Sequence, residues 1–427
     1  MKLSSILGLN ARSRLFSYKY GSAVGKKIAR SKILTKRTLT RNGVSEVPEI
    51  YKIFKTPRDV FAFDWTKLPP SFALKPSKGL GGEGIIVIKK RTQDENGWIT
   101  TARKLVTRED LKLHVLDILE GAYSVGNVPD VAFCEEYVAR HKAFRKLAFR
   151  GTPDVRIIVF NKVPVMAMLR LPTRESGGRA NLHQGAIGTG VDIPTGITTR
   201  AVWYGELIKH KPETKRKLNG IKIPHWTKIL ELAVRGQEAS GLGYVGVDIV
   251  LHPSKGPLIL EINSSPGLQV QLANMEGLRK RLERVEDLEV RDAEHGVRIA
   301  KALFAGPFVG RVKNDEGIKT VNVVEEIKIR GVNGEKVNVT AKVDTGAWTT
   351  SIDKKFAKDL GIFESNRILW YKRTRNSLGL EDRPVIAIVF WLGGKRIKTV
   401  ATVADRSNLA YKILVGRSDL KGFVVNP

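Results

Sequence analysis

Several residue types are scarce in this chain of 427 residues, and each shortage excludes a class of protein. The single cysteine, Cys134, rules out a disulfide framework and favours a reducing compartment, so we expect a cytoplasmic protein. No run approaches the roughly 18 apolar residues that a membrane helix needs, and we expect no membrane association. All seven histidines lie at or before His295, which leaves residues 321–427 with neither histidine nor cysteine to bind zinc.

Acidic residues are also scarce, because 73 Lys and Arg face 43 Asp and Glu and the formal net charge is +30. A nucleic acid, an anionic membrane face or a polyanionic substrate would each explain this charge. No zinc-finger or RNP motif supports a nucleic acid as the partner. Residues 1–60 hold 14 Lys or Arg against 3 Asp or Glu, which is typical of a mitochondrial transit peptide or of a basic segment of the folded protein.

Length and hydropathy patterning predict two or three domains. Helical spacing covers residues 26–42, 107–120, 226–240 and 276–304, and strand patterns cover 71–76, 85–90, 131–138, 155–161, 163–172, 244–251 and 257–263. Beyond them, short alternating strands predict an all-β domain. We therefore expect a short basic segment over 1–30, an α+β domain over 31–304, a linker over 305–320 and a small all-β barrel over 321–427.

Three oxygen-bearing side chains stand out in "VGVDIVLHPSKGPLILEIN", residues 245–263. Side chains alternate along a strand, so Glu261 and Asn263 share a face, and a hairpin would bring Asp248 of the partner strand beside them. Two carboxylates and an amide, without histidine or cysteine, suit Mg²⁺ that holds nucleotide phosphates. The alternative is the solvated polar face of an ordinary hairpin.

The segment "KPSKGLGGEG", residues 75–84, places four glycines between two predicted strands and directly after Lys75. Glycine lets backbone N–H groups turn toward an anion, so this loop predicts a flap over phosphate. It lacks the Gly-Lys-Ser/Thr end of a Walker A loop, and a strand follows it instead of the helix of a Rossmann fingerprint.

A second glycine-containing segment, residues 168–188, is rich in basic side chains. Arginine forks suit carboxylate and phosphate, which makes Arg170 and Arg179 candidates for binding an acidic substrate. Arg174 is interpreted as an ordinary basic surface residue, and His183 fits a buried core histidine equally well.

The chain resembles the ATP-grasp superfamily, and within it the RimK-like alpha-L-glutamate ligase-related branch, through an ordered series of segments over roughly residues 5–300: "LGLNARSRLF", "ARSKILTKRTL", "GVSEVPEIY", "FALKPSKGLGGEGI", "FCEEYV", "DVRIIVFN", "RANLHQGAIG", "GVDIVL" and "LEINSSPGL". The resemblance makes the basic leader part of the enzyme, with the usual first domain reduced to about thirty residues. It implies ATP and two Mg²⁺ ions, with Mn²⁺ as an alternative. The implied site residues are Arg156 and Arg179 for catalysis, Lys32, Lys75, Gly81, Gly82, Glu135, Glu136 and Asn181 for nucleotide, and Asp248, Glu261 and Asn263 for metal.

The chemistry implied by this resemblance is carboxylate activation. ATP phosphorylates a carboxylate, and an amine then displaces phosphate from the acyl phosphate to form an amide, for which glutamate is one candidate substrate. The alternative is a protein that binds ATP as a sensor and docks a partner without turnover. The expected partners are carboxylate and amine substrates, either amino acids or the ends of peptides or proteins.

The tail resembles the retropepsin-like domain of RimB-type proteins, sometimes called ATP-dependent zinc proteases, through "AKVDTGAWTTSI", "RPVIAIVFWLGG" and "ATVADRSNLAYKILVGRSDLKGFVV". The lack of histidine and cysteine argues against zinc here. An aspartic mechanism needs two carboxylates that share a proton, and Asp344 supplies one, so a homodimer through 321–427 would be required. An active homodimeric peptidase, a substrate-binding module and a dimerisation domain all remain open.

Overall fold

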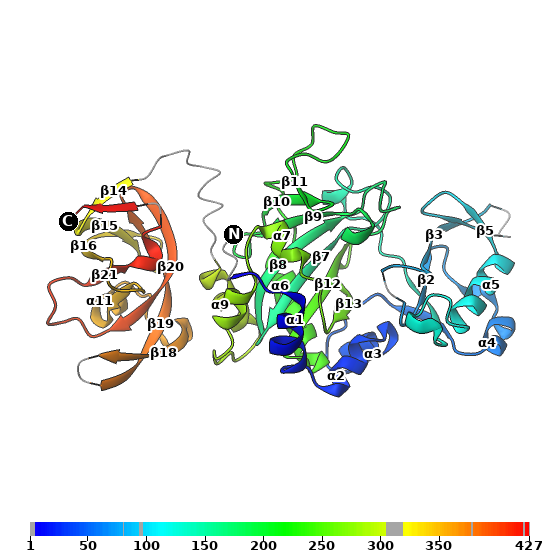
Figure 1. Ribbon diagram of the computed structural model, residues 1–427, viewed down its shortest axis with the longest axis horizontal. Helices are drawn as coiled ribbons and strands as arrows, with labels where there is room; N and C mark the ends of the chain where they lie inside the picture. The colour runs from blue at the N-terminus through cyan, green and yellow to red at the C-terminus, as the bar shows by residue number, and fades with distance from the viewer. Residues whose placement is uncertain are drawn as a thin grey trace. The chain divides into compact units, whose positions relative to one another are not determined.

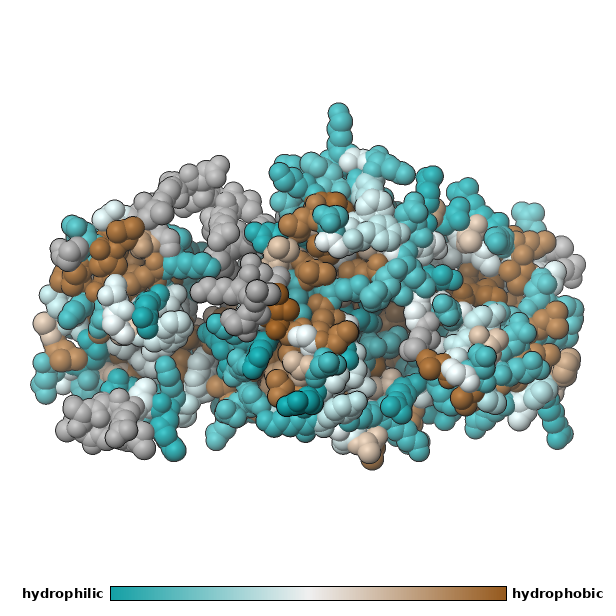
Figure 2. Space-filling model, viewed as in Figure 1, coloured by the Kyte–Doolittle hydropathy of each residue, from teal (hydrophilic) through white to brown (hydrophobic). Residues whose placement is uncertain are grey.

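The computed structural model describes residues 5–79, 81–93, 97–304, 319–376, 379–421 and 423–426 (Figure 1). The chain forms two compact units, one of Met1–Val191 with Thr195–Glu286 and one of Asp192–Pro194 with Asp287–Pro427. Hydrophilic residues cover most of the face that Figure 2 shows, as the dispersed charge leads one to expect. Within the described residues, no helix is long and apolar enough to cross a membrane.

The first unit begins with short helices that aromatic packing ties to a sheet. After α1 (Leu9–Arg12), a π-helical turn carries Phe16, whose ring packs against those of Phe160 and Tyr244. Two helices follow, α2 (Ala23–Ala29) and α3 (Lys32–Arg41). The single helix predicted over 26–42 is wrong, because Ser31 is extended and its Oγ accepts a hydrogen bond from the Leu34 N–H, which starts a new helix.

A six-stranded antiparallel sheet in the first unit has the order β1-β6-β2-β3-β4-β5. Its apolar core includes Phe54, Trp65 and Phe72, and Cys134 is fully buried there with its thiol pKa raised by burial. The elements are β1 (Ile50–Phe54), α4 (Pro57–Ala62), β2 (Phe72–Pro76), β3 (Ile86–Arg91), β4 (Gly97–Thr100), β5 (Leu105–Thr107), α5 (Arg108–Leu119) and β6 (Ala132–Glu136).

A seven-stranded antiparallel sheet has the order β11-β10-β9-β8-β7-β12-β13, and α6 packs against it. Helix α6 ends at Gly241, whose φ of +66° suits glycine, as the sequence predicts. The elements are β7 (Asp154–Phe160), β8 (Val163–Leu171), β9 (Ile187–Val191), β10 (Thr198–Trp203), β11 (Glu206–Ile208), α6 (Trp226–Ser240), β12 (Tyr244–His252), β13 (Gly256–Asn263), α7 (Gln269–Asn274) and α8 (Arg279–Glu283).

The second unit is mainly β, as expected, and its sheet closes into a barrel because β15 pairs with both β16 and β19. The sheet order is β15-β16-β21-β17-β20-β19-β18, and β14 pairs with β22. The elements are α9 (Ala293–Leu303), β14 (Lys319–Asn322), β15 (Val324–Arg330), β16 (Lys336–Asp344), β17 (Ser351–Asp353), α11 (Lys354–Asp359), β18 (Ile368–Asn376), β19 (Gly379–Leu392), β20 (Lys395–Ala404), β21 (Ile413–Gly416) and β22 (Phe423–Asn426).

The predicted helix over 276–304 is wrong in a way that changes the division of the chain. Helix α8 ends at Glu283, and α9 begins separately where Asp292 Oδ1 accepts a hydrogen bond from the His295 N–H at 2.7 Å. Helix α9 lies in the second unit. Of the predicted linker over 305–320, residues 305–318 lie outside the described residues, and 319–320 open β14.

Candidate nucleotide and metal site

A cavity of about 1090 Å³ lies in the first unit, and both sheets of that unit contribute to its wall. The glycine loop after β2 lines it on one side and the hairpin β12–β13 on another. The cavity brings together every residue that the sequence assigned to nucleotide, metal or ligase chemistry: Lys32, Lys75, Gly81, Gly82, Glu135, Glu136, Arg156, Arg179, Asn181, Asp248, Glu261 and Asn263. Arg170 is also part of the wall.

The three candidate metal ligands converge because β12 and β13 form the expected hairpin. Asp248 lies directly opposite Glu261, and Gly246 lies opposite Asn263, with a bulge just after Asp248. The side chain of Asp248 is buried, and the Asn263 Nδ2 donates to its Oδ2 at 3.3 Å. Glu261 is half-buried, and its carboxylate has no hydrogen-bond or ion-pair partner among the described residues.

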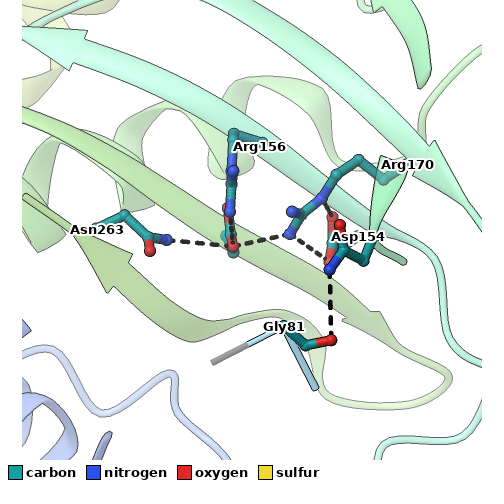
Figure 3. A network of polar contacts seen from close by, with 7 residues as sticks. Gly81, Asp154, Arg156, Arg170 and Asn263 are labelled. Atoms are coloured by element: carbon teal, nitrogen blue, oxygen red, sulfur yellow. Dashed lines mark hydrogen bonds and ion pairs between the residues drawn. The ribbon is translucent and has the colours of Figure 1, made fainter. Parts of the chain in front are cut away.

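Two arginines, Arg156 on β7 and Arg170 on β8, hold Asp248. Figure 3 shows both arginines in one polar network with Asp154 and Asn263. Arg156 on β7 donates from Nε and Nη2 to the two carboxylate oxygens, both at 2.7 Å. Arg170 on β8 donates to Asp248 Oδ2 at 2.8 Å and binds Asp154 through two hydrogen bonds, at 2.5 and 2.7 Å. Arg170 thus binds two carboxylates of the protein and also lines the cavity, and its expected contact with an acidic substrate stays a prediction.

Burial and neighbouring charges shift the pKa values of the two aspartates of this network, Asp154 and Asp248, in opposite directions. Burial together with the charge of Asp248 raises the pKa of Asp154 to about 6, against the opposing effect of Arg170. Burial would also raise the pKa of Asp248, but Arg156 and Arg170 outweigh it and lower that pKa. Asp248 therefore stays ionised, which a metal ligand requires.

The glycine loop lies against the segment of residues 168–188. Its backbone conformation explains why glycine occupies two of its positions. Gly81 and Gly82 have φ of +64° and +82°, which L side chains rarely adopt. The Gly81 carbonyl accepts a hydrogen bond from Asn181 Nδ2 at 3.4 Å, and a Cβ built on Gly82 would lie 3.4 Å from Arg179 Cδ. The guanidinium of Arg179 has no partner among the described residues, so it is available to an anion in the cavity.

The candidate phosphate lysines have different neighbours. Lys32 donates to the Gly79 carbonyl at 2.6 Å. Lys75 binds Glu135 Oε1 at 2.5 Å. The carboxylate of Glu135 is buried and paired with lysine, and its expected contact with adenine or ribose stays a prediction. Glu136 is paired with Lys255 at 2.5 Å.

Arg174, interpreted as an ordinary surface residue, and His183, whose role was left open, are not among the residues that line this cavity. Arg174 is exposed and stacks over the Phe149 ring, with its Cζ 5.6 Å from the centroid. His183 is exposed, so its interpretation as a core histidine is wrong. It borders a smaller cavity of about 240 Å³.

Asp344, in the second unit, lies at the end of β16 opposite Gly416 of β21. Its Oδ1 accepts hydrogen bonds from the backbone N–H groups of Gly346 at 2.8 Å and Ala347 at 3.2 Å, which fixes the turn that follows the strand. Asp344 is half-buried, and Trp348 nearby is 63% exposed.

The sequence profile described as "Sugar-transfer associated ATP-grasp" matches residues 11–287. The chain belongs to the ATP-grasp family. The match ends one residue beyond the boundary of the first unit at Glu286, and it includes the basic N-terminal segment from residue 11.

Known proteins resemble different parts of this ATP-grasp chain. The "Probable alpha-L-glutamate ligase" of Aeromonas salmonicida is 31% identical over 170 residues, which cover 36% of this chain and 44% of that protein, so the match spans less than half of the relative. A RimK domain ATP-grasp protein of Sphaerobacter thermophilus has 12% identity and a TM-score of 0.35, over 62% of this chain and 70% of that one. The Simian Foamy Virus protease has 20% identity and a TM-score of 0.18, over 23% of this chain and 91% of that one. These structural scores are too low to assign a family to the second unit.

The hairpin residues fit the metal that this family uses, since ATP-grasp ligases work with ATP and Mg²⁺. Asp248, Glu261 and Asn263 offer only oxygen, the ligand atom that Mg²⁺ prefers. Each carboxylate oxygen can accept more than one interaction, so Asp248 can keep its arginines and still bind a cation. No group of three or more His, Cys, Asp or Glu side chains placed to hold a metal occurs in the described part of the chain, so the Asn263 amide would be needed.

Sequence reasoning missed two charged residues of this ATP-grasp site. Lys36 is buried beside Glu135, with Nζ 3.1 Å from Oε2. It follows Lys32 by one helical turn, a spacing that could have placed both on one face. Asp154 pairs with Arg170 directly across β7 and β8, but nothing in the sequence gives the register that joins them.

Proposed function

We propose that the first unit is an ATP- and Mg²⁺-dependent carboxylate–amine ligase that forms an amide or peptide bond. The observation that carries the proposal is the cavity of about 1090 Å³, whose wall combines Lys32 and Lys75, a glycine loop with positive φ and an all-oxygen ligand set. A triphosphate and its cation need these three features in one place. Two Mg²⁺ ions, or Mn²⁺ in their place, are the proposed metal complement.

In the proposed reaction a carboxylate oxygen attacks the γ-phosphorus of ATP and ADP leaves, and an amine then displaces phosphate from the acyl phosphate. Mg²⁺ held by Asp248, Glu261 and Asn263 would offset phosphate charge. Lys32, Lys75 and the backbone of Gly81 and Gly82 hold the phosphates, and Glu136 with Asn181 borders the nucleotide. Arg179, whose guanidinium is unpaired among the described residues, stabilises the transferring phosphoryl group.

The substrates are proposed from two sources. The curated relatives are glutamate ligases by name, which supports a glutamyl donor or acceptor. The family description speaks of sugar transfer, which supports amino sugars as a second group of amines to test.

The experiment measures ADP and phosphate release with Mg²⁺, ATP and matrices of carboxylates and amines. Turnover that depends on one carboxylate and one amine, with the amide identified by mass spectrometry, is the expected result. Glu261→Gln should lose this turnover with its melting temperature retained. Asp248→Asn should also lose it, and this variant should melt earlier because it breaks the buried ion pairs with Arg156 and Arg170. Glu283→Gln, an exposed residue paired with Arg279, serves as the control. Full turnover in either hairpin variant would refute the metal assignment.

A second candidate function is a nucleotide sensor. One observation favours it: both oxygens of Asp248 already accept hydrogen bonds from arginine, which leaves fewer acceptor positions for a cation. A sensor would bind ATP tightly and release no ADP with any carboxylate–amine pair.

For the second unit, we propose a peptide-binding role, with aspartic peptidase activity if two copies of the chain pair through residues 321–427. One chain supplies a single Asp-Thr-Gly motif, at Asp344, and the mechanism needs two carboxylates. A dimerisation domain without activity is the alternative. Sedimentation analysis with a peptide-library cleavage assay separates these outcomes.

A further inference from the structure

Two lysines share one buried glutamate, which lines the cavity. Lys75 of β2 contacts Oε1 of Glu135 at 2.5 Å, and Lys36 of α3 approaches Oε2 at 3.1 Å. Lys36, Lys75 and Glu135 are 3%, 9% and 1% exposed, so little water reaches this group. Lys75 and Glu135 line the cavity, whereas Lys36 is not among the residues of its described wall.

The charges of Lys36, Lys75 and Glu135 do not balance, and this excess of positive charge in a buried place needs an explanation. Two buried ammonium groups face one carboxylate, and a buried charge without a partner is costly. Burial lowers the pKa of Lys36, against the attraction of Glu135 and with a further lowering from Lys75. If residue 36 served only to pack α3 against its surroundings, an apolar side chain such as leucine would do so without the cost of a buried charge. The presence of a lysine there therefore indicates a function for its charge.

We propose that Lys36 is a positioning residue that keeps Glu135 neutralised when Lys75 leaves it to bind a nucleotide phosphate. The inference rests on the proposed function, because it needs an anion in the cavity. Without Lys36, the departure of Lys75 would leave Glu135 buried and unpaired, a loss that ranks among the largest for a single ion pair. With Lys36 present, Lys75 exchanges one anion for another at little cost.

The test measures binding of Mg²⁺-ADP by isothermal titration calorimetry. Lys36→Met keeps the length of the side chain and removes its charge, and it should bind nucleotide at least about tenfold more weakly than wild type. Lys36→Met/Glu135→Gln removes both charges and should recover most of that loss. Arg37→Met removes a charge from an exposed position of the same helix and serves as the control.

The outcomes separate a positioning role from a structural one. Equal binding in wild type and Lys36→Met overturns the inference and leaves the proposed function intact, whereas no binding by wild type overturns both. Failure of the double variant to recover, with its fold intact by circular dichroism, also overturns the inference.

If Lys36→Met does not fold, wild-type protein with ¹⁵N-labelled lysine carries the test. Addition of Mg²⁺-ADP should shift the ammonium signal of Lys75 more than that of Lys36, because Lys36 loses a neighbouring charge but keeps its contact with Glu135. A shift of the Lys36 signal alone would contradict the proposal.

Discussion

Arg156 donates two hydrogen bonds to Asp248, from Nε to Oδ1 and from Nη2 to Oδ2, each at 2.7 Å. The two residues are direct cross-strand partners on β7 and β12. A two-point contact fixes both the position and the plane of the carboxylate, which a single hydrogen bond cannot do. Arg156 therefore fixes the orientation of the carboxylate that we propose as a metal ligand, without the help of a cation.

This relationship predicts the effect of Arg156→Lys. Lysine keeps the charge but offers one point of contact, so Asp248 should rotate and ADP formation should fall by about tenfold or more. The apparent Mg²⁺ requirement should rise in the same titration. Arg235→Lys, which alters the surface pair with Glu46, should change neither quantity. Unchanged magnesium dependence in Arg156→Lys would show that the arginine does not orient the ligand.

The glycine loop predicts that Gly81→Ala weakens nucleotide binding. Alanine at φ of +64° costs about 1–2 kcal/mol, and its Cβ would lie 3.3 Å from Asn181 Nδ2. Gly220→Ala is the matched control, because its φ is +79° and no atom lies within 4 Å of the added Cβ. Both variants should melt earlier, and only Gly81→Ala should lose affinity for Mg²⁺-ADP. Equal affinities would remove this loop from the nucleotide site.

Asp344 predicts different results for two substitutions. Asparagine retains an oxygen that can accept from the Gly346 and Ala347 N–H groups, so Asp344→Asn should melt close to wild type. Alanine removes that acceptor and should destabilise the second unit by about 1–2 kcal/mol. Calorimetry on the full chain measures both. Peptide cleavage that persists in Asp344→Asn would rule out this carboxylate as a catalytic group.

His295 predicts a pH dependence of stability in the second unit. Its Nδ1 accepts a hydrogen bond from the Arg291 N–H at 3.2 Å, and its Nε2 donates to the Leu369 carbonyl at 2.6 Å, so the folded state uses the neutral ring. Burial lowers its pKa. The stabilisation is present above the unfolded pKa of about 6.5 and is lost as pH falls through the lowered folded value.

Melting temperatures across this pH range test that assignment. His295→Gln should lower the melting temperature above about pH 7 and should flatten its decline below about pH 6.5. His210→Gln, at an exposed position, is the control for the loss of an imidazole. A variant whose pH profile runs parallel to wild type would refute the role of His295.

The sequence predicted most elements whose pattern is local. Helix α6 and the hairpin β12–β13 follow from periodicity, turn residues and the stop at Gly241. The break at Ser31 and the separation of α8 from α9 were missed, because side-chain caps there override a continuous apolar pattern.

For the site, too, the sequence predicted the arrangement of residues that are close in the chain but not the contacts between distant segments. Residues on one hairpin or one loop were gathered correctly into the cavity wall. The pairing of Arg170 with Asp154, and of Lys36 with Glu135, depends on strand register and on how a helix docks against a sheet. Spacing along the chain does not encode these contacts, so ion pairs between distant segments could not be assigned.

Cys134, the single thiol of the chain, is buried in β6 and its pKa is raised, so it reacts poorly with maleimides or haloacetamides in the folded state. A cysteine introduced at an exposed position would therefore take up a fluorophore alone, without prior removal of the native residue. One dye on each unit would then report, by energy transfer, how the distance between them responds to nucleotide.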